Sequence, residues 1–537
     1  MKKIFLYIAV AALGLAGLNG CNDFGDMNVD PEHLSEEGLI NSSYNMVFTM
    51  TQVQALGSDW DVWRNGIIYG STMLQHTTSV DWSYVFYTYD EAYNSAFWDV
   101  YCSDNRGVVR EIIKIVNKWE GQEEFKNDYQ IARIMKAYIF HRMTDLYGDI
   151  PYSEAGRITD VLYPKYDTQK AIYDDLLKEL DEAQAAISGS SSQLGSADLY
   201  YGGDASKWKK FANSLMLRVA MRLSKVDENT AKTWAAKALA NGVITSTDEN
   251  AMLRHTDGIA TNDSAEPYGK IFSESNPDAF FISETFMNML TGANDPRIAL
   301  IGTVCTDPGK GYTNSAYEKG NPDPTVQKGM PVGYNLAGGQ WDLSLASGYP
   351  GGNFKSVYSV PSRYTYADPA KGVTMIVTHA ETQLLLAEAH VRGWITAGSA
   401  EDYYNAGIRA AMEQFKFYSG ATELYAQYLT PAAVDTYVTA NALTGSNENK
   451  YKQINTQYYI TTFCDEYESF ANWRRSGYPE LTPVNKAYPD CVTNGTIPRR
   501  FTYPSGEAQS NPANYLEAVR RLSDGDRMTS RVWWDKE

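Results

Sequence analysis

Residues 168–187 read TQKAIYDDLLKELDEAQAAI, and the periodicity of this stretch decides the fold class. Its apolar residues recur at steps of three or four and so lie on one face of a helix: Ile172, Leu176, Leu180, Ala183 and Ile187. Charged side chains occupy the other face, and Thr168 is a suitable N-cap. The stretch therefore predicts an amphipathic helix that buries one face against a partner.

The same pattern recurs along much of the chain. Helices are predicted at about 104–116, 131–147, 208–219, 229–240, 376–394, 400–416 and 448–472. Gly148 and Pro151 end the second of these. No strict sequence repeat is present, but amphipathic pairs with modest connections favour stacked helical hairpins of the tetratricopeptide kind. We predict a mainly α fold with a helical scaffold at about 37–241 and 376–480.

Residues 242–375 differ in composition from this scaffold. Gly, Pro, Asn, Asp and Ser become frequent, as in 307–311 (DPGKG) and 347–352 (SGYPGG). Long loops in a compact protein are usually functional. We expect an irregular, loop-rich lobe with few short strands, which packs on the scaffold and carries the ligand surface.

The N-terminus has the features of an exported lipoprotein. Lys2 and Lys3 precede an uncharged apolar run, 4–18, which ends in Leu-Asn-Gly-Cys at 18–21. The run is shorter than the about 20 residues that a spanning helix needs. We predict a signal peptide at 1–20, acylation of Cys21 and a lipid-anchored tether at 21–36. An ordinary cleaved signal followed by an unrelated Cys is the alternative.

Composition limits the possible ligands. The chain has 47 basic and 65 acidic residues and a formal net charge of −18, which disfavours nucleic acid and anionic lipid headgroups as partners. It also contains 39 Tyr, 12 Trp and 18 Phe. Tyr and Trp combine a flat apolar face with a polar edge, which suits neutral, hydroxyl-rich ligands such as sugars.

Cysteine and histidine give weaker signals. Cys102, Cys305, Cys464 and Cys491 are widely spaced, and the sequence leaves open whether they form disulfides or remain free thiols. Only six His are present, so a His-based metal site is not expected. Loops rich in Asp and Asn can hold structural calcium, but no EF-hand pattern occurs. We predict no cofactor and no metal site.

A series of short motifs runs along the chain: 144–155 (TDLYGDIPYSEA), 208–215 (WKKFANSL), 294–297 (NDPR), 381–389 (ETQLLLAEA), 474–479 (RRSGYP) and 497–501 (IPRRF). These motifs resemble those of the SusD/RagB family of Bacteroidetes outer-membrane lipoproteins. They stand in the order expected for that family and, with the lipoprotein signal, cover nearly the whole mature chain. The Arg-Arg-x-Gly-Tyr-Pro signature is similar to that of the SusD-like branch.

The resemblance implies a role as well as a fold. Members of the family sit on the cell surface, cap a SusC-type TonB-dependent transporter and deliver a captured glycan or peptide to it, without catalysis of their own. The motifs themselves favour a structural role. Glu381 and Glu388 interrupt an apolar helix and need buried partners, which Arg474, Arg475, Arg499 or Arg500 can provide.

Ligand contacts are expected on exposed aromatic side chains in three groups. Residues 81–101 are the densest group, and the alternation of Trp82, Tyr84 and Phe86 places all three on one side of an extended segment. Tyr89 belongs to the same group. Trp60 belongs to the second group, and the third lies in the glycine-rich loops, with Tyr334, Trp341 and Tyr349.

Three other functions remain open from the sequence. A glycoside hydrolase needs two suitably spaced carboxylates, which 65 acids neither establish nor exclude. Sequence motifs of serine hydrolases, zinc peptidases and phosphate loops are missing. A peptide-capturing RagB-like protein is the second alternative, and a purely structural surface protein is the third. The aromatic content favours glycan binding without enzymatic activity.

Overall fold

The computed structural model describes residues 41–102, 107–157, 160–256, 265–306, 319–368, 370–484 and 487–537. Its contacts divide the chain into two units, residues 1–47 and residues 48–537. The predicted signal peptide, Cys21 and the tether at 21–36 lie outside the described residues. The first unit contributes the first half of α2 (Asn41–Gln54). No helix within the described ranges is long and apolar enough to cross a membrane.

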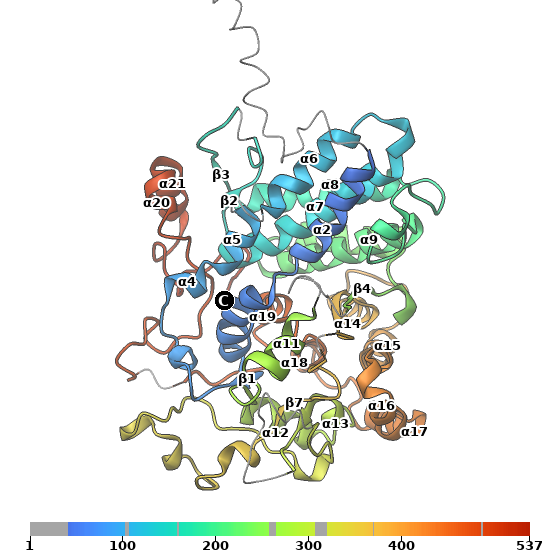
Figure 1. Ribbon diagram of the computed structural model, residues 1–537. Coiled ribbons are helices and arrows are strands. Elements are labelled where there is room, and N and C mark those ends of the chain that lie inside the picture. The colour runs from blue at the N-terminus through green and yellow to red at the C-terminus, as the bar shows by residue number, and fades with distance from the viewer. Residues whose placement is uncertain are drawn as a thin grey trace, which may run out of the picture. The chain divides into compact units, whose positions relative to one another are not determined.

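A first set of scaffold helices follows residue 107 in the unit 48–537 (Figure 1). They are α6 (Val108–Trp119), α7 (Lys126–Tyr147), α8 (Gln169–Ala186), α9 (Ala205–Arg222) and α10 (Glu228–Asn241). Each helix packs on the next. The α8 side chains Ile172, Leu176 and Leu180 are fully buried, as the periodicity predicts. The mainly α fold with tetratricopeptide-like helix pairs is thus confirmed.

A second set of helices completes the scaffold. It consists of α14 (His379–Val391), α15 (Ala400–Glu413), α16 (Thr422–Tyr428), α17 (Pro431–Ala440), α18 (Asn447–Thr461) and α19 (Glu466–Ser476). Helix α14 packs on α15, α18 and α9, and so joins the two sets. The expectation of one helical stretch over 448–472 is wrong, because the chain turns at Cys464, whose φ is 68°. Helices α16, α17, α20 (Glu507–Ser510) and α21 (Pro512–Arg521) were not predicted.

The segment 242–375 contains short elements joined by long loops. Strand β4 (Ala251–Arg254) pairs with β8 (Val373–Val377), and β6 (Gly302–Thr303) pairs with β7 (Val360–Pro361), both antiparallel. Three short helices lie between them: α11 (Pro267–Lys270), α12 (Glu284–Gly292) and α13 (Ile298–Ile301). Strand β5 (Phe281–Ile282) pairs with β1 (Thr77–Thr78), so the loop-rich lobe is tied to the segment that precedes the aromatic residues 82–101.

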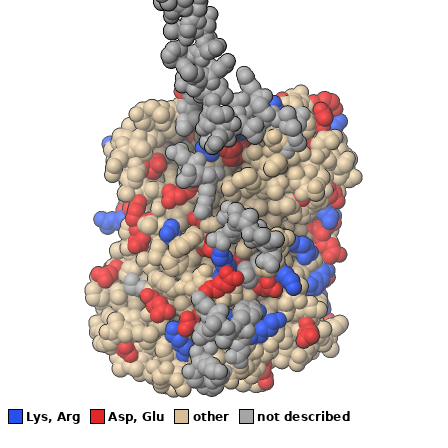
Figure 2. All heavy atoms as spheres, in the orientation of Figure 1, with Lys and Arg blue, Asp and Glu red and all other residues tan. Residues whose placement is uncertain are grey.

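Within the unit 48–537, the first set of helices and the loop-rich lobe lie toward opposite ends. Helices α6, α7 and α8 lie at one end, together with the short hairpin of β2 (Ile150–Pro151) and β3 (Tyr166–Asp167). Helices α12 and α13 lie at the other end with β7 (Figure 1). On the face drawn in Figure 2, the coloured acidic and basic side chains are interspersed, and neither sign forms a continuous patch.

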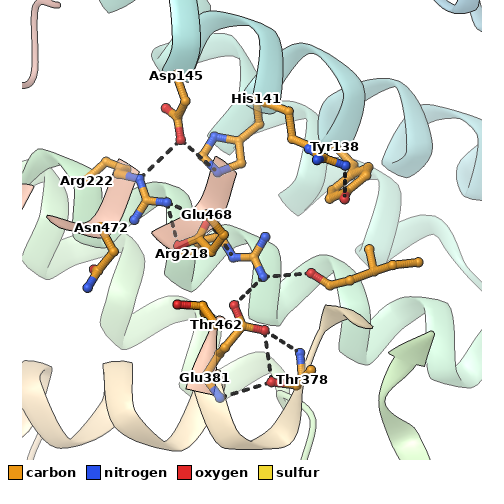
Figure 3. A network of polar contacts seen from close by, with 12 residues as sticks. Tyr138, His141, Asp145, Arg218, Arg222, Thr378, Glu381, Thr462, Glu468 and Asn472 are labelled. Atoms are coloured by element: carbon orange, nitrogen blue, oxygen red, sulfur yellow. Dashed lines mark hydrogen bonds and ion pairs between the residues drawn. The ribbon is translucent and has the colours of Figure 1, made fainter. Parts of the chain in front are cut away.

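Buried arginine–carboxylate contacts hold the scaffold helices together (Figure 3). On α9, Arg222 donates to Asp145 of α7 at 3.2 Å and to Glu468 of α19 at 2.6 Å. One turn earlier, Arg218 donates to Glu381 of α14 at 2.8 Å. The prediction that Glu381 and Glu388 need arginine partners is confirmed. Arg475 binds Glu388, as proposed, but the partner of Glu381 is Arg218 and none of the four arginines proposed.

Candidate functional site: an exposed aromatic cluster

Five aromatic side chains form one continuous cluster, which we term the aromatic surface: Trp60, Trp63, Trp82, Tyr84 and Tyr93. They are carried by α3 (Asp59–Asp61), the π-helix η4 (Val62–Ser71), the 3-10 helix η5 (Ser83–Phe86) with its N-cap, and α4 (Glu91–Asn94). Trp63 is the centre, with its ring 5.4 Å from Trp60 and 5.8 Å from Trp82. The first and second groups of candidates therefore form one surface.

Neighbouring side chains hold the rings of the aromatic surface in position. Trp82 stacks on the buried ring of Phe280, with centroids 5.0 Å apart and planes 8° from parallel. The Arg64 guanidinium lies 5.1 Å from the centre of the Trp60 ring and 5.6 Å from that of Tyr93. Trp60 is 53% exposed, and Trp63 and Trp82 are half-buried. The rings are thus held in position before any ligand arrives, which lowers the entropic cost of binding.

The expectation of an extended segment at 82–86 is wrong. Residues 83–86 form the 3-10 helix η5, which ends at Tyr87 in the left-handed conformation, with φ 59°. A 3-10 helix has three residues per turn, so residues two apart, such as Tyr84 and Phe86, point in different directions, whereas a strand would place them on the same side. As a result, Phe86 is fully buried and stacks on Tyr488 at 3.9 Å, whereas Trp82 and Tyr84 stay half-exposed. Phe86 thus packs inside the protein and offers no free face to a ligand.

The third candidate group contacts Phe86 and Tyr488 through Trp341. The Trp341 ring is half-exposed and lies 6.1 Å from Phe86 and 6.0 Å from Tyr488. Its loop is braced across its base, since the Asn335 N–H donates to the Trp341 carbonyl and the Leu343 N–H to the Asn335 carbonyl. Tyr334 and Tyr349 are partly buried and pack against the hydrophobic core of the lobe. Trp341 is therefore the member of this group with the clearest connection to residues 82–86.

Polar groups flank the aromatic rings. Asp81 lies next to Trp82 in the sequence, and partial burial of its carboxyl raises its pKa, against the attraction of Lys355. Lys355 in turn pairs with Asp278 at 3.1 Å. Tyr89 is 40% exposed, and its hydroxyl donates to Glu91. Partial burial raises the pKa of Tyr89 to about 12, so the hydroxyl remains a donor at neutral pH. The combination of ring faces and hydrogen-bonding groups suits a hydroxyl-rich ligand.

Sequence reasoning missed the residues that support this surface. Phe280 and Tyr488 lie about 200 and 400 residues from Trp82 and Phe86, and no local pattern links them. Arg64 was missed although it follows Trp63 directly in the sequence. Its spacing of four from Trp60 places both on one helical face, so this contact was accessible from the sequence.

One cluster among the described residues has the composition of a metal site. His141, Asp145 and Glu468 bring three potential ligand atoms within 4.8 Å of one another. However, Arg222 already donates to both carboxylates, and Tyr173 donates to Asp145. Burial lowers the pKa of His141 to about 4, so the ring is neutral. Two buried arginines next to these acids oppose a metal cation, and the cluster acts as a structural network. Cys102, Cys464 and Cys491 are free thiols, and Cys305 is buried.

The family described as starch-binding and associating with the outer membrane matches residues 40–504. The chain belongs to this SusD-like family. The resemblance seen in the sequence motifs is thereby confirmed. No curated protein sequence matches the chain well enough to add to this assignment.

Solved structures agree with the family assignment. A chitin-binding protein is 31% identical, with a TM-score of 0.77, covering 92% of this chain and 100% of its own. A Bacteroidetes AC2a SusD-like protein is 26% identical, with a TM-score of 0.79 and coverages of 92% and 100%. A chitin-binding SusD homologue from Flavobacterium johnsoniae is 25% identical, with a TM-score of 0.71 and coverages of 92% and 98%.

Proposed function

We propose that this SusD-like protein is a cell-surface lipoprotein that captures a glycan and delivers it to a SusC-type TonB-dependent transporter of the outer membrane. The observation that carries the proposal is the aromatic surface, where preorganised indole and phenol rings are flanked by carboxylates and a lysine. The family description supports association with the outer membrane. The lipid anchor at Cys21 and the transporter partner are inferred from the sequence motifs.

Chitin-type oligosaccharides are the first ligand class to test, because two similar structures are described as chitin-binding. Starch is the second, from the family description. In this proposal the protein binds without catalysis. The adjacent acids Asp465 and Glu466 do not lie on the aromatic surface. Glu466 is fully buried and pairs with His76 at 2.8 Å.

Binding is tested by calorimetry on residues 22–537 with chitin oligosaccharides, soluble starch, other polysaccharides and an oligopeptide pool. We expect Trp60→Ala and Trp82→Ala each to weaken glycan binding at least about fivefold, because one ring contact contributes on the order of 1 kcal/mol. The control is Trp234→Ala, a half-buried Trp on α10 outside the aromatic surface, which should bind like the wild type.

Each alternative has its own outcome in the same experiment. Binding of peptides alone would replace the glycan proposal by a RagB-like peptide role. Release of new reducing ends would show a glycoside hydrolase. Co-purification of a TonB-dependent transporter with the lipidated full chain tests the delivery step, and a lipidated chain that never co-purifies with one would contradict it.

A further inference from the structure

The helical scaffold contains a pocket that is separate from the aromatic surface. It is bounded by α6, α7, α8 and the turn 152–157, and we term it the scaffold pocket. Its volume of about 420 Å³ falls within the range of small-molecule sites. None of the aromatic-surface residues lines it. Helices α6, α7 and α8 lie at the end of the unit opposite α12 and α13 (Figure 1).

The turn 152–157 forms one wall of the scaffold pocket, and its backbone lies very close to α6. Gly156 has a φ of +70°, and a Cβ atom at this position would lie 2.8 Å from Ile113 Cδ1 of α6. The turn therefore packs directly on α6. Within the pocket, the Tyr152 ring meets Phe140 edge to face, with centroids 4.7 Å apart, and its hydroxyl donates to Asp175 at 2.6 Å. Two contacts thus fix the orientation of the Tyr152 ring.

The charged groups of the pocket are already paired within the protein. Asp167 accepts hydrogen bonds from the Ser153 N–H and hydroxyl, both at 2.8 Å. Lys136 pairs with Glu179 at 2.8 Å. Lys136 and Arg157 balance Asp167 and Asp175, so the lining has no net formal charge. A charged ligand would therefore find no unpaired group of opposite charge in this pocket.

Spare hydrogen-bonding capacity remains in the lining. A carboxylate accepts about four hydrogen bonds, and an ammonium group donates three. Ser153, Asp167 and Asp175 thus supply acceptors next to the donors of Lys136. Apolar atoms of Ile113, Phe140 and Ala171 complete the wall. Donors, acceptors and apolar patches in one neutral hollow suit a ring that bears both hydroxyl groups and a C–H face.

We propose that the scaffold pocket binds a neutral pyranose ring independently of the aromatic surface. The site requires no transporter and no catalytic group. It does not depend on the proposed glycan site, because the two are formed by different elements.

The test is saturation-transfer NMR with N-acetylglucosamine and with glucose, on the chain carrying Trp60→Ala and Trp82→Ala. We expect transfer to at least one of the two sugars to persist in this background. Ala171→Phe fills the pocket from α8 and should reduce the transfer at least about fivefold. Ala171→Ser keeps the pocket open and should leave the transfer within about twofold of its parent. Ala171 is exposed, so both changes avoid the core.

Ala155→Leu fills the pocket from the opposite wall. If Ala171→Phe lowers the melting temperature of the protein, saturation transfer is measured on Ala155→Leu instead, and the same reduction is expected. Equal transfer in the filled and open variants would overturn the proposal. Absence of transfer from both sugars in the open variants would also overturn it. Neither result would affect the proposed glycan site, which is measured by the Trp60 and Trp82 variants in otherwise wild-type protein.

Discussion

Arg475 and Glu388 lie inside the protein, each with about 1% of its side chain exposed. Two parallel hydrogen bonds of 2.7 Å join them, and Arg475 also donates to Asn455 and Asn472. Burial alone would raise the pKa of Glu388, but Arg475 and Arg392 outweigh it and hold the pKa well below its usual range. The pair is fully satisfied, so removing part of it leaves a buried charge without its partner.

Arg475→Lys should therefore destabilise the protein although it keeps the charge. Lysine cannot form the double contact, and the expected loss in the free energy of unfolding is about 3 kcal/mol, measured by urea denaturation. The matched control is Arg409→Lys, whose partner Asp435 lies 2.6 Å away in a largely exposed pair. There we expect a change below about 1 kcal/mol. Equal losses in the two variants would contradict this view of the buried pair.

Asp465 should make the free energy of unfolding depend on pH in an unusual way. Burial raises its pKa to about 7, although Arg142 partly opposes the shift. In the unfolded chain an Asp titrates near pH 3.9. Between about pH 4 and pH 7 the folded protein therefore keeps this carboxyl protonated while the unfolded chain has lost the proton. The free energy of unfolding consequently falls as the pH rises through that range. Asp465→Asn removes this loss. Its free energy of unfolding should exceed that of the wild type at pH 8 by up to about 4 kcal/mol.

The comparison at low pH provides the control for Asp465. At pH 4.5 the folded wild-type carboxyl is protonated, so the difference in the free energy of unfolding between the two proteins should shrink to about 1 kcal/mol. Glu266 is buried, and burial raises its pKa to about 7, so Asp465→Asn keeps part of the pH dependence. A variant that is less stable than the wild type at pH 8 would show that Asp465 is held ionised by its arginine neighbours.

At the level of elements, α14 and α15 depend on one small residue at their contact. A Cβ atom on Gly407 of α15 would lie 2.7 Å from Leu384 Cγ of α14 and 3.3 Å from the Ala380 carbonyl oxygen. Gly407→Ala improves helix propensity by about 1 kcal/mol, but overpacking of a tight contact costs about 1–3 kcal/mol. We expect a net loss of about 1 kcal/mol in urea unfolding. Gly292→Ala, at the end of α12 with open space around it, should cause no comparable loss.

The helical elements were predictable because each carries its own signal. The α8 periodicity and the Thr168 cap are local, and the structure shows the Thr168 hydroxyl accepting from the Ala171 N–H at 3.3 Å. The break at Cys464 and the 3-10 helix η5 have no such signal, because both depend on packing against distant segments. Of the candidate site, the sequence identified Trp60, Trp82 and Tyr84, but the fixing contact of Trp82 comes from Phe280 in the lobe.

At the scale of the molecule, net charge and aromatic content both favour a neutral ligand over a polyanion. The formal net charge is −18, and removal of the predicted signal peptide, which carries Lys2 and Lys3, would make it more negative. The visible face mixes both signs and has no basic patch that would attract a polyanion (Figure 2). Under the proposed function, a neutral glycan binds through ring faces and hydrogen bonds, which salt screens only weakly.

Salt dependence therefore tests the charge argument for the whole protein. For the neutral glycan with the strongest binding, we expect Kd to change by less than about twofold between about 0.05 and 0.5 M NaCl, because neutral contacts release no counterions. An acidic polysaccharide of similar length should bind more weakly, most clearly at low salt, where the negative protein repels it. Calorimetry at both salt concentrations measures the two ligands side by side. A steep loss of neutral-glycan affinity with salt would show that Arg64 or Lys355 binds through charge, and would shift the recognised ligand towards anionic glycans.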